Sequence, residues 1–286
     1  MHFPIKSFLI AVLLVLFQDE LKAGGWPQPQ GGGFFKLDFS FIRAREYYGM
    51  DGNIYNINGA GTRLSNYVTS FYGEYGITNK LTAITYVPFF TRNTVNEGIG
   101  ALSGDILQPG LENNAIGDID LGLRYGWWAK NGWSVTTSLI LGLPTGDAEN
   151  ENLLFTGDGE FNQLLRLEAG YGKAKWYATG YAGFNNRTSG FSDEFRYELE
   201  FGHKFLEEHL LVGAKLSGIQ SLKNGDPTGS GNGLFSNNVE FFSPQLFVAY
   251  EMKNGLGLSA QVAGAVSGRN VLAAPAVSFG VYLKLN

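Results

Sequence analysis

Twelve segments of this chain alternate apolar and polar residues, and the gaps between them alternate in length. In the first segment, Leu37 and Phe39 alternate with Lys36 and Asp38. Successive side chains of a strand point to opposite faces, so this pattern makes one face apolar and the other polar. Short gaps lie at 77–80, 129–132, 172–175, 206–209 and 253–255, and longer loops at 45–63, 91–115, 144–160, 186–193, 222–238 and 267–272. The ordered set predicts an all-β fold, a transmembrane antiparallel up-and-down β-barrel of about 12 strands, with 10 to 14 possible.

The alternation of gap length also predicts an orientation. Bacterial barrels place short turns in the periplasm and long loops outside, so an even strand number puts both ends of the barrel domain on the short-turn side. Trp127, Trp128 and Trp133 flank the turn 129–132, and Trp176 lies beside the turn 172–175. Tryptophans gather at membrane interfaces, so these four predict a periplasmic aromatic girdle.

The first residues are typical of a secretory signal. Lys6 supplies a positive charge, and Phe8–Phe17 form an apolar run that is too short to span a bilayer. We expect a signal peptide over 1–23 with cleavage near Ala23, a flexible periplasmic leader over 24–33, and an outer-membrane barrel over 34–286. A short N-terminal anchor helix is the alternative reading of the first segment.

Composition removes several classes of function. The chain has no cysteine, which excludes disulfides, thiolate zinc sites and a cysteine nucleophile. A net charge of −5 gives no reason to expect nucleic acid as a partner. The acidic loop 144–160 matches no EF-hand spacing, so we expect a solvated loop rather than a calcium site. No cofactor and no metal are expected, and the expected partners are outer-membrane lipid, the barrel-assembly machinery and small apolar or aromatic solutes.

An enzyme is the main competing class, because one outer-membrane phospholipase carries a Ser-His-Asn/Gln site on a barrel of similar size. His203 and His209 fall at the predicted periplasmic end, away from outer-leaflet lipid. Asp118 and Asp120 could serve acid–base chemistry, but a lumen wall with arginine partners is the commoner arrangement of such carboxylates. We therefore expect no enzyme and assign no catalytic, cofactor-binding or metal-binding residue.

Charged residues of both signs occupy the inward positions of the predicted strands. The lumen-lining candidates are Asp38, Glu74, Asp118, Asp120, Arg124, Arg166, Glu168, Arg196, Glu198 and Lys215. They would either line a narrow wet channel or pair across it and seal it. Twelve strands lie between filled 8-stranded barrels and open 16-stranded porins, so strand number leaves both outcomes open.

Four motifs resemble the phenol meta-pathway outer-membrane protein family. They are YGITNKLT at 75–82, GDIDLGLRY at 117–125, GLPTG at 142–146 and TGDG at 156–159. Members of that family are β-barrel transporters, more loosely similar to channels for long-chain fatty acids and aromatic hydrocarbons. The resemblance implies a passive transporter for small apolar or aromatic molecules in the outer membrane of a Gram-negative bacterium. The alternatives are a non-transporting structural or surface-binding barrel and, less favoured, a lipid-modifying enzyme.

Overall fold

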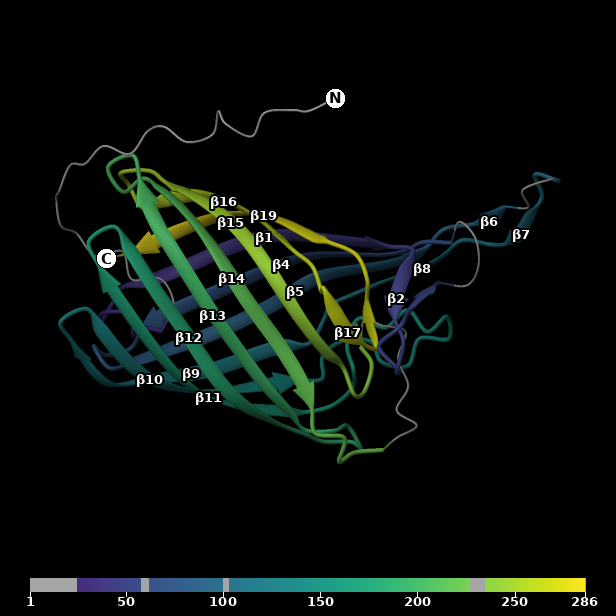
Figure 1. The fold of residues 1–286 in the computed structure, drawn as a ribbon, viewed down its shortest axis with the longest axis horizontal. Coiled ribbons are helices and arrows are strands. Elements are labelled where there is room, and N and C mark those ends of the chain that lie inside the picture. The colour runs from purple at the N-terminus through teal and green to yellow at the C-terminus, as the bar shows by residue number, and fades with distance from the viewer. Residues whose placement is uncertain (1–24, 58–61, 100–102, 227–234, 286) are drawn as a thin grey trace, which may run out of the picture.

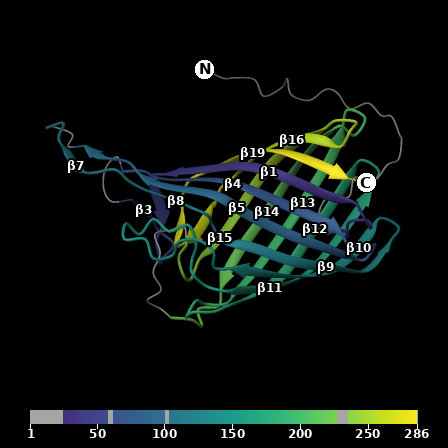
Figure 2. The same cartoon turned by 180° about the vertical axis from the view of Figure 1, so that it is seen from behind.

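The computed structural model describes residues 25–57, 62–99, 103–226 and 235–285, and these form a closed antiparallel β-barrel of 12 strands (Figures 1 and 2). The barrel strands are β1 (Gly33–Ala44), β4 (Leu64–Gly76), β5 (Leu81–Val95), β9 (Ile119–Lys130), β10 (Trp133–Leu143), β11 (Asn162–Lys173), β12 (Trp176–Arg187), β13 (Glu194–Phe205), β14 (Leu210–Ser221), β15 (Glu240–Glu251), β16 (Leu256–Ala263) and β19 (Ala276–Leu285). The predicted fold class and strand number are confirmed.

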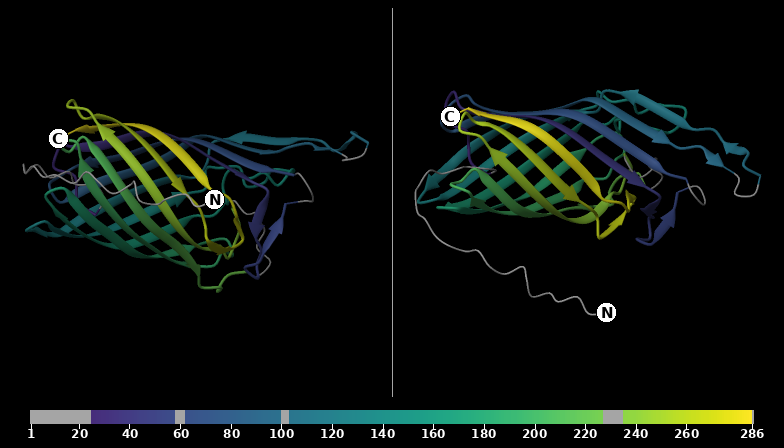
Figure 3. Two further views of the ribbon diagram at one scale, coloured as in Figure 1. Left: turned by 45° about the horizontal axis from the view of Figure 1, so that its top comes forward. Right: turned by 90° about the horizontal axis from the view of Figure 1, so that it is seen from above.

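Closure comes from the pairing of the first barrel strand with the last. β1 pairs with β4 on one side and with β19 on the other, so that Phe39 lies opposite both Thr69 and Phe279. The remaining strands pair in sequence order around the ring, including β14 with β15 (Figure 3). A closed ring satisfies the backbone hydrogen bonds internally, which a bilayer requires.

The two faces of the wall follow the period-2 pattern of the sequence. On β9, Leu121, Leu123 and Tyr125 are exposed on the outside, whereas Arg124 between them is buried on the inside. A shift of the pairing register by one residue would exchange these two faces, so the apolar outer face fixes the register of each strand. The described residues include no helix long and apolar enough to cross a bilayer.

Exposed tryptophans gather at the end of the barrel that carries the short turns, called here the short-turn end. Trp127, Trp128, Trp133 and Trp176 are all exposed. Tyr171 lies between two of them, with ring centroids 4.7 Å from Trp133 and 5.3 Å from Trp176. This arrangement suits an aromatic belt at a membrane interface.

At the opposite, long-loop end the described residues form seven further short strands. They are β2 (Glu46–Tyr48), β3 (Ile54–Asn56), β6 (Gly98–Ile99), β7 (Ile106–Gln108), β8 (Leu111–Ala115), β17 (Ser267–Arg269) and β18 (Val271–Leu272). The predicted third strand, 81–90, continues to Val95, because β8 returns alongside it within the expected loop 91–115. The ribbon of β5 and β8 and the β6–β7 pair project from the barrel (Figure 1).

Residues 25–33 depart from the expected flexible leader, because they follow a defined course along the lumen wall. The amide of Gln28 donates to Thr82 Oγ1 at 2.8 Å, and the amide of Gly31 donates to the carbonyl of Gly76 at 2.9 Å. The segment lacks periodicity because it is no strand, and contacts with residues distant in sequence order it instead. The expected signal peptide lies outside the described residues.

Candidate functional site in the barrel lumen

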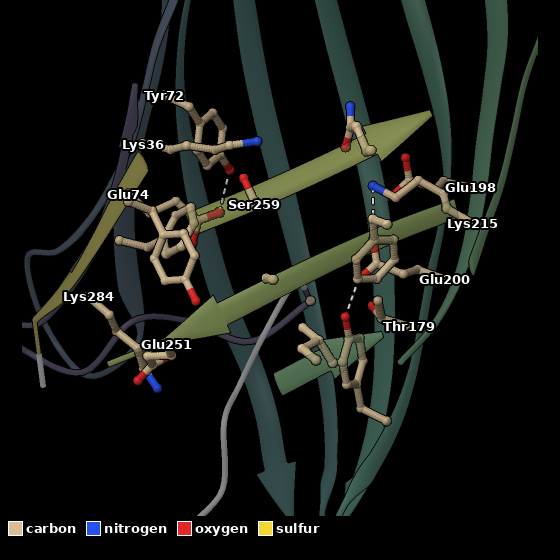
Figure 4. A pocket seen from close by; sticks show the side chains of 18 of the residues that line it. Lys36, Tyr72, Glu74, Thr179, Glu198, Glu200, Lys215, Glu251, Ser259 and Lys284 are labelled. Atoms are coloured by element: carbon tan, nitrogen blue, oxygen red, sulfur yellow. Dashed lines mark hydrogen bonds and ion pairs between the residues drawn. The ribbon is translucent and has the colours of Figure 1, made fainter. Parts of the chain in front are cut away.

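The lumen contains a cavity of about 470 Å³ toward the short-turn end. Its wall mixes charged and aromatic side chains from strands on opposite sides of the barrel, among them Lys36, Tyr72, Glu74, Glu198, Glu200 and Lys215 (Figure 4). Of the ten predicted lumen residues, Glu74, Arg124, Arg166, Glu168, Glu198 and Lys215 line this cavity. The inward positions of the strands therefore meet around one space.

Arg124 is the centre of the first group of ion pairs. Its Nη1 lies 3.0 Å from Glu74 Oε1, and its Nε lies 3.2 Å from Glu168 Oε2. Arg166 adds a second cation to Glu168, with Nε 3.2 Å from Oε1. Glu74 comes from β4, whereas Arg166 and Glu168 come from β11. The group around Arg124 therefore links strands that are not neighbours in the ring. Leaving any member of such a buried group unpaired would be costly.

Lys215 is the centre of a second group on the opposite wall. Its Nζ lies 2.9 Å from Glu200 Oε2 and 3.2 Å from Glu198 Oε1, and the Tyr177 hydroxyl donates to Glu200. Figure 4 shows Glu198, Glu200 and Lys215 pointing into the cavity from the neighbouring strands β13 and β14. One lysine therefore balances two carboxylates, and the hydroxyl of Tyr177 supplies a further donor to the second of them.

The segment 25–32 narrows the lumen beside the Arg124 group. Gln28 Nε2 donates to Glu74 Oε2 at 2.8 Å, and Arg124 Nη1 donates to the carbonyl of Trp26 at 3.4 Å. Trp26 is buried against β11, where a side-chain carbon at Gly170 would lie 2.7 Å from its ring. The segment is thus hydrogen-bonded to charged lumen residues, and Gly170 leaves room for the indole ring of Trp26.

The other four predicted lumen residues lie elsewhere. Asp38 pairs with Lys36 at 2.6 Å, and Arg196 pairs with Glu194 at 2.6 Å. Asp120 begins the inner face of β9, and Asp118 precedes that strand at the long-loop end. Asp118 accepts hydrogen bonds from two loop amides rather than from an arginine, so the structure does not place it in the predicted wall of ion pairs.

The loop 144–160 is not the solvated loop expected from its acidic composition. Leu154 and Phe155 are buried, and Glu160 is 1% exposed. Glu160 Oε1 lies 2.7 Å from Arg187 Nε, and burial, the largest influence, raises the pKa of Glu160. Asp158 and Glu160 of this loop therefore form ion pairs with Arg187 of β12 inside the mouth of the barrel.

Several residues with partners inside the barrel were missed from the sequence. Gln28 and Trp26 carry no periodic signal, and Tyr177 lies on β12, whose two faces look alike in sequence. Arg187, which pairs with Asp158, Glu160 and Glu194, follows a run of small and polar residues. The inward position of Arg187 follows from the register of β12 against β11, which the sequence alone does not set.

His203 and His209 lie at the short-turn end of the barrel, at the end of β13 and in the turn that follows it. His209 Nδ1 lies 2.6 Å from the carbonyl oxygen of Glu251, and His203 packs edge-on against Phe205. Within the described part of the chain, neither ring is hydrogen-bonded to a serine hydroxyl, and no group of three or more histidine, aspartate or glutamate side chains is placed to hold a metal ion.

Fold and lumen together define an antiparallel barrel of the outer-membrane type. The structure is similar to the crystal structure of the COG4313 outer membrane channel from Pseudomonas putida F1, with a TM-score of 0.71, 13% identity, and coverage of 93% of this chain and 100% of that chain. It is also similar to the NanC porin, with a TM-score of 0.50, 8% identity, and coverage of 87% and 100%. At such identities the likeness establishes the fold alone.

The family follows from the sequence profile. The family described as "Putative MetA-pathway of phenol degradation" matches residues 56–280, so this chain belongs to that family. The resemblance drawn from the four motifs is confirmed. No curated protein sequence matches the chain.

Proposed function

We propose that this chain is a passive outer-membrane channel for small molecules. The observation that carries the proposal is a cavity of about 470 Å³ inside a closed transmembrane barrel. Cavities of roughly 300–1,000 Å³ suit small ligands. The likeness to outer-membrane channels supports the same reading through the shared fold.

Apolar or aromatic solutes are the cargo that we favour. Phe34, Tyr72 and Tyr282 form an aromatic group in the lumen, with ring centroids 5.3 Å apart for Phe34 and Tyr282 and 6.3 Å apart for Phe34 and Tyr72. Phe247 lines the same cavity. The neighbouring charges are largely paired, which reduces the field that a single sign of charge would exert on a solute. A flat ring can contact these aromatic groups without breaking an ion pair.

We place the protein in the outer membrane of a Gram-negative bacterium, with the short turns in the periplasm and signal cleavage near Ala23. The apolar outer face and the exposed tryptophans support insertion into lipid. Outer-membrane lipid and the barrel-assembly machinery are the partners that such a protein would need, and we propose both on that basis.

Uptake into proteoliposomes tests the proposal. The full mature chain is reconstituted and offered single-ring aromatic solutes, small polar solutes and a disaccharide of larger size. We expect the aromatic solutes to enter faster than in protein-free vesicles and the disaccharide to be excluded. Equal rates with and without folded protein for every solute would refute the channel, whereas faster entry of polar solutes alone would refute the cargo class.

A surface-binding role is the second candidate, and one observation favours it. The ribbon of β5, β8, β6 and β7 projects from the long-loop end and exposes Ile99 and Ile106 (Figure 1). If the lumen is sealed, this ribbon is the part of the described chain best placed to meet another molecule. A folded barrel without transport in the vesicle experiment would favour this second role.

A further inference from the structure

Three aromatic side chains inside the lumen each lie over a glycine of the neighbouring strand. The pairs, with the distance from a carbon added at the glycine to the nearest ring atom, are Tyr177 over Gly202 (2.3 Å), Phe247 over Gly213 (2.2 Å) and Tyr282 over Gly257 (2.1 Å). In each pair the two residues stand directly opposite each other in the strand register. Because no side-chain carbon fits at these distances, the glycines are what allow the rings to lie against the wall.

The three rings line the cavity near its short-turn end. Gly202 lies near the end of β13, and Gly213 and Gly257 lie near the beginnings of β14 and β16, so all three pairs are close to short turns. The glycines are buried, and all three rings border the cavity. Tyr177 is 2% and Tyr282 is 7% exposed, so the space beside them is narrow. We call the rings of Tyr177, Phe247 and Tyr282 the aromatic arc.

The aromatic arc lies across the lumen from the segment 25–32. That segment contacts β4, β5, β9 and β11, where its partners are Glu74, Thr82, Gly126 and Gly170. The three pairs lie on β12 and β13, on β14 and β15, and on β16 and β19, which form the other part of the ring. The passage at the short-turn end therefore runs between the segment 25–32 and the aromatic arc.

The rings of the aromatic arc are held in different ways. The hydroxyl of Tyr177 donates to Glu200, which is paired with Lys215 (Figure 4). The ring of Tyr282 packs against Phe34, with the centroids 5.3 Å apart. The three atoms nearest to a carbon added at Gly257 all belong to the far end of the Tyr282 side chain. A substitution at Gly257 therefore acts first on that ring.

An added carbon at Gly213 has a second effect, because it would also lie 2.6 Å from the carbonyl oxygen of Phe201. A substitution there would disturb the backbone of β13 as well as the ring of Phe247. Gly257 is consequently the sharpest place to change the aromatic arc alone.

We propose that the aromatic arc is the size filter of the lumen, and that the three glycines opposite it set the width of the passage. With each ring over its glycine, space remains beside the segment 25–32. A carbon at the glycine would force the ring into another rotamer, and since the wall of the barrel is closed, the ring would move into the lumen. The inference rests on the proposed function, because a size filter matters only in a lumen that conducts.

Single-channel conductance of the folded variants in planar bilayers tests the filter through a double-mutant cycle on Gly257 and Tyr282. Gly257→Ala should lower the conductance, because the displaced ring enters the passage. Tyr282→Ala should raise the conductance, and in proteoliposomes it should admit the disaccharide that the parent protein excludes. In the double variant, Gly257→Ala should have no effect on the conductance, because there is no ring to displace.

Gly218→Ala is the matched control, since the same arrangement occurs there on the outer face of the barrel. Gly218 stands opposite Tyr197, and an added carbon would lie 2.4 Å from that ring. Phe195 and Leu199, two positions to either side of Tyr197, are exposed to the outside. Gly218→Ala should therefore leave the conductance unchanged, and a loss equal to that of Gly257→Ala would overturn the filter by showing a general distortion of the wall.

The remaining outcomes separate the filter from the channel. A conducting parent with unchanged conductance in Gly257→Ala and Tyr282→Ala would overturn the filter and leave the proposed function standing. If Gly257→Ala does not fold, Tyr282→Ala decides alone, and an unchanged conductance together with exclusion of the disaccharide would overturn the filter. A folded parent without current would refute the proposed function, and the filter with it.

Discussion

The two ends of the lumen are narrowed by different chemistry. At the short-turn end, the segment 25–32 is held by backbone hydrogen bonds, by the packing of Trp26 over Gly170, and by Gln28, which donates to the Glu74 carboxylate of the buried pair with Arg124. At the long-loop end, the loop 144–160 is held by a carboxylate that accepts two amides beside other carboxylates. Glu74 at the short-turn end is paired with a buried arginine, whereas no lysine or arginine of the described residues lies within 4.0 Å of Asp118. We therefore expect a change of pH to affect the second constriction more than the first.

The two constrictions also bear differently on the stability of the barrel. The Arg124 group lies between the two constrictions and links the wall to the segment 25–32. It is buried, so its loss threatens the barrel itself. The loop 144–160 can detach from Asp118 without breaking any strand pairing of the ring. Strand pairing and the attachment of this loop thus depend on different residues.

The largest expected effect is that of Arg124→Met. Removing the cation leaves Glu74 and Glu168 buried without their main partner, and breaking a buried pair costs roughly 3–5 kcal/mol. We expect a loss of that order in the free energy of unfolding, measured by urea titration in detergent micelles. A cost below about 1 kcal/mol, the range of exposed pairs, would mean that the lumen is wetter than its geometry indicates.

Leu154→Ala should loosen the long-loop end alone. The side chain is 2% exposed, and truncating a buried leucine costs roughly 2–5 kcal/mol of the local packing energy. Hydrogen exchange should rise in the loop 144–160 and stay unchanged in residues 25–32. Equal increases at both ends would contradict their independence. Leu153→Ala is the control, because its side chain is exposed.

Gly170→Ala should loosen the short-turn end alone. The added carbon would meet the Trp26 ring at 2.7 Å, and such overpacking typically costs 1–3 kcal/mol. The Gln28 amide, which is bonded to Thr82, should then exchange faster. Gly172→Ala is the matched control, since its added carbon would lie 3.6 Å from the same ring in ordinary contact. Identical exchange in the two variants would show that Trp26 does not hold the segment.

The smallest effect belongs to Arg92→Ala. Arg92 Nη2 lies 2.6 Å from Glu112 Oε2, but both side chains are about half exposed. Exposed pairs contribute about 0–1 kcal/mol and are screened by salt. The midpoint of urea unfolding should hardly move, and a loss comparable to that of Arg124→Met would show that burial does not rank these ion pairs.

The wall of the barrel was predictable because its signal is local. Residues 64–76 and 133–143 were bounded correctly by alternation and by the turns that follow or precede them. Each lumen side chain of a strand is two positions from the next, so Arg166 and Glu168 could be placed on the same face without knowledge of the fold.

The contents of the lumen were not predictable in the same way. Gln28 donates a hydrogen bond to Glu74, 46 positions away, and no periodic pattern in the sequence marks this contact. The loop 144–160 was misread because its charge suggested exposure, while Leu154 and Glu160 are buried by partners on five other segments, β1, β4, β5, β12 and β18. Asp118 likewise follows the period of β9 but is bonded to the loop. Non-local contacts decide all three cases.

Single-channel recording in a planar bilayer tests the central claim most directly. The refolded mature chain, with its barrel verified by circular dichroism, is added at neutral pH. The cavity between two narrow ends predicts small, stepwise, ohmic currents. A folded barrel that passes no current at any pH would contradict the account, because the lumen would then be sealed.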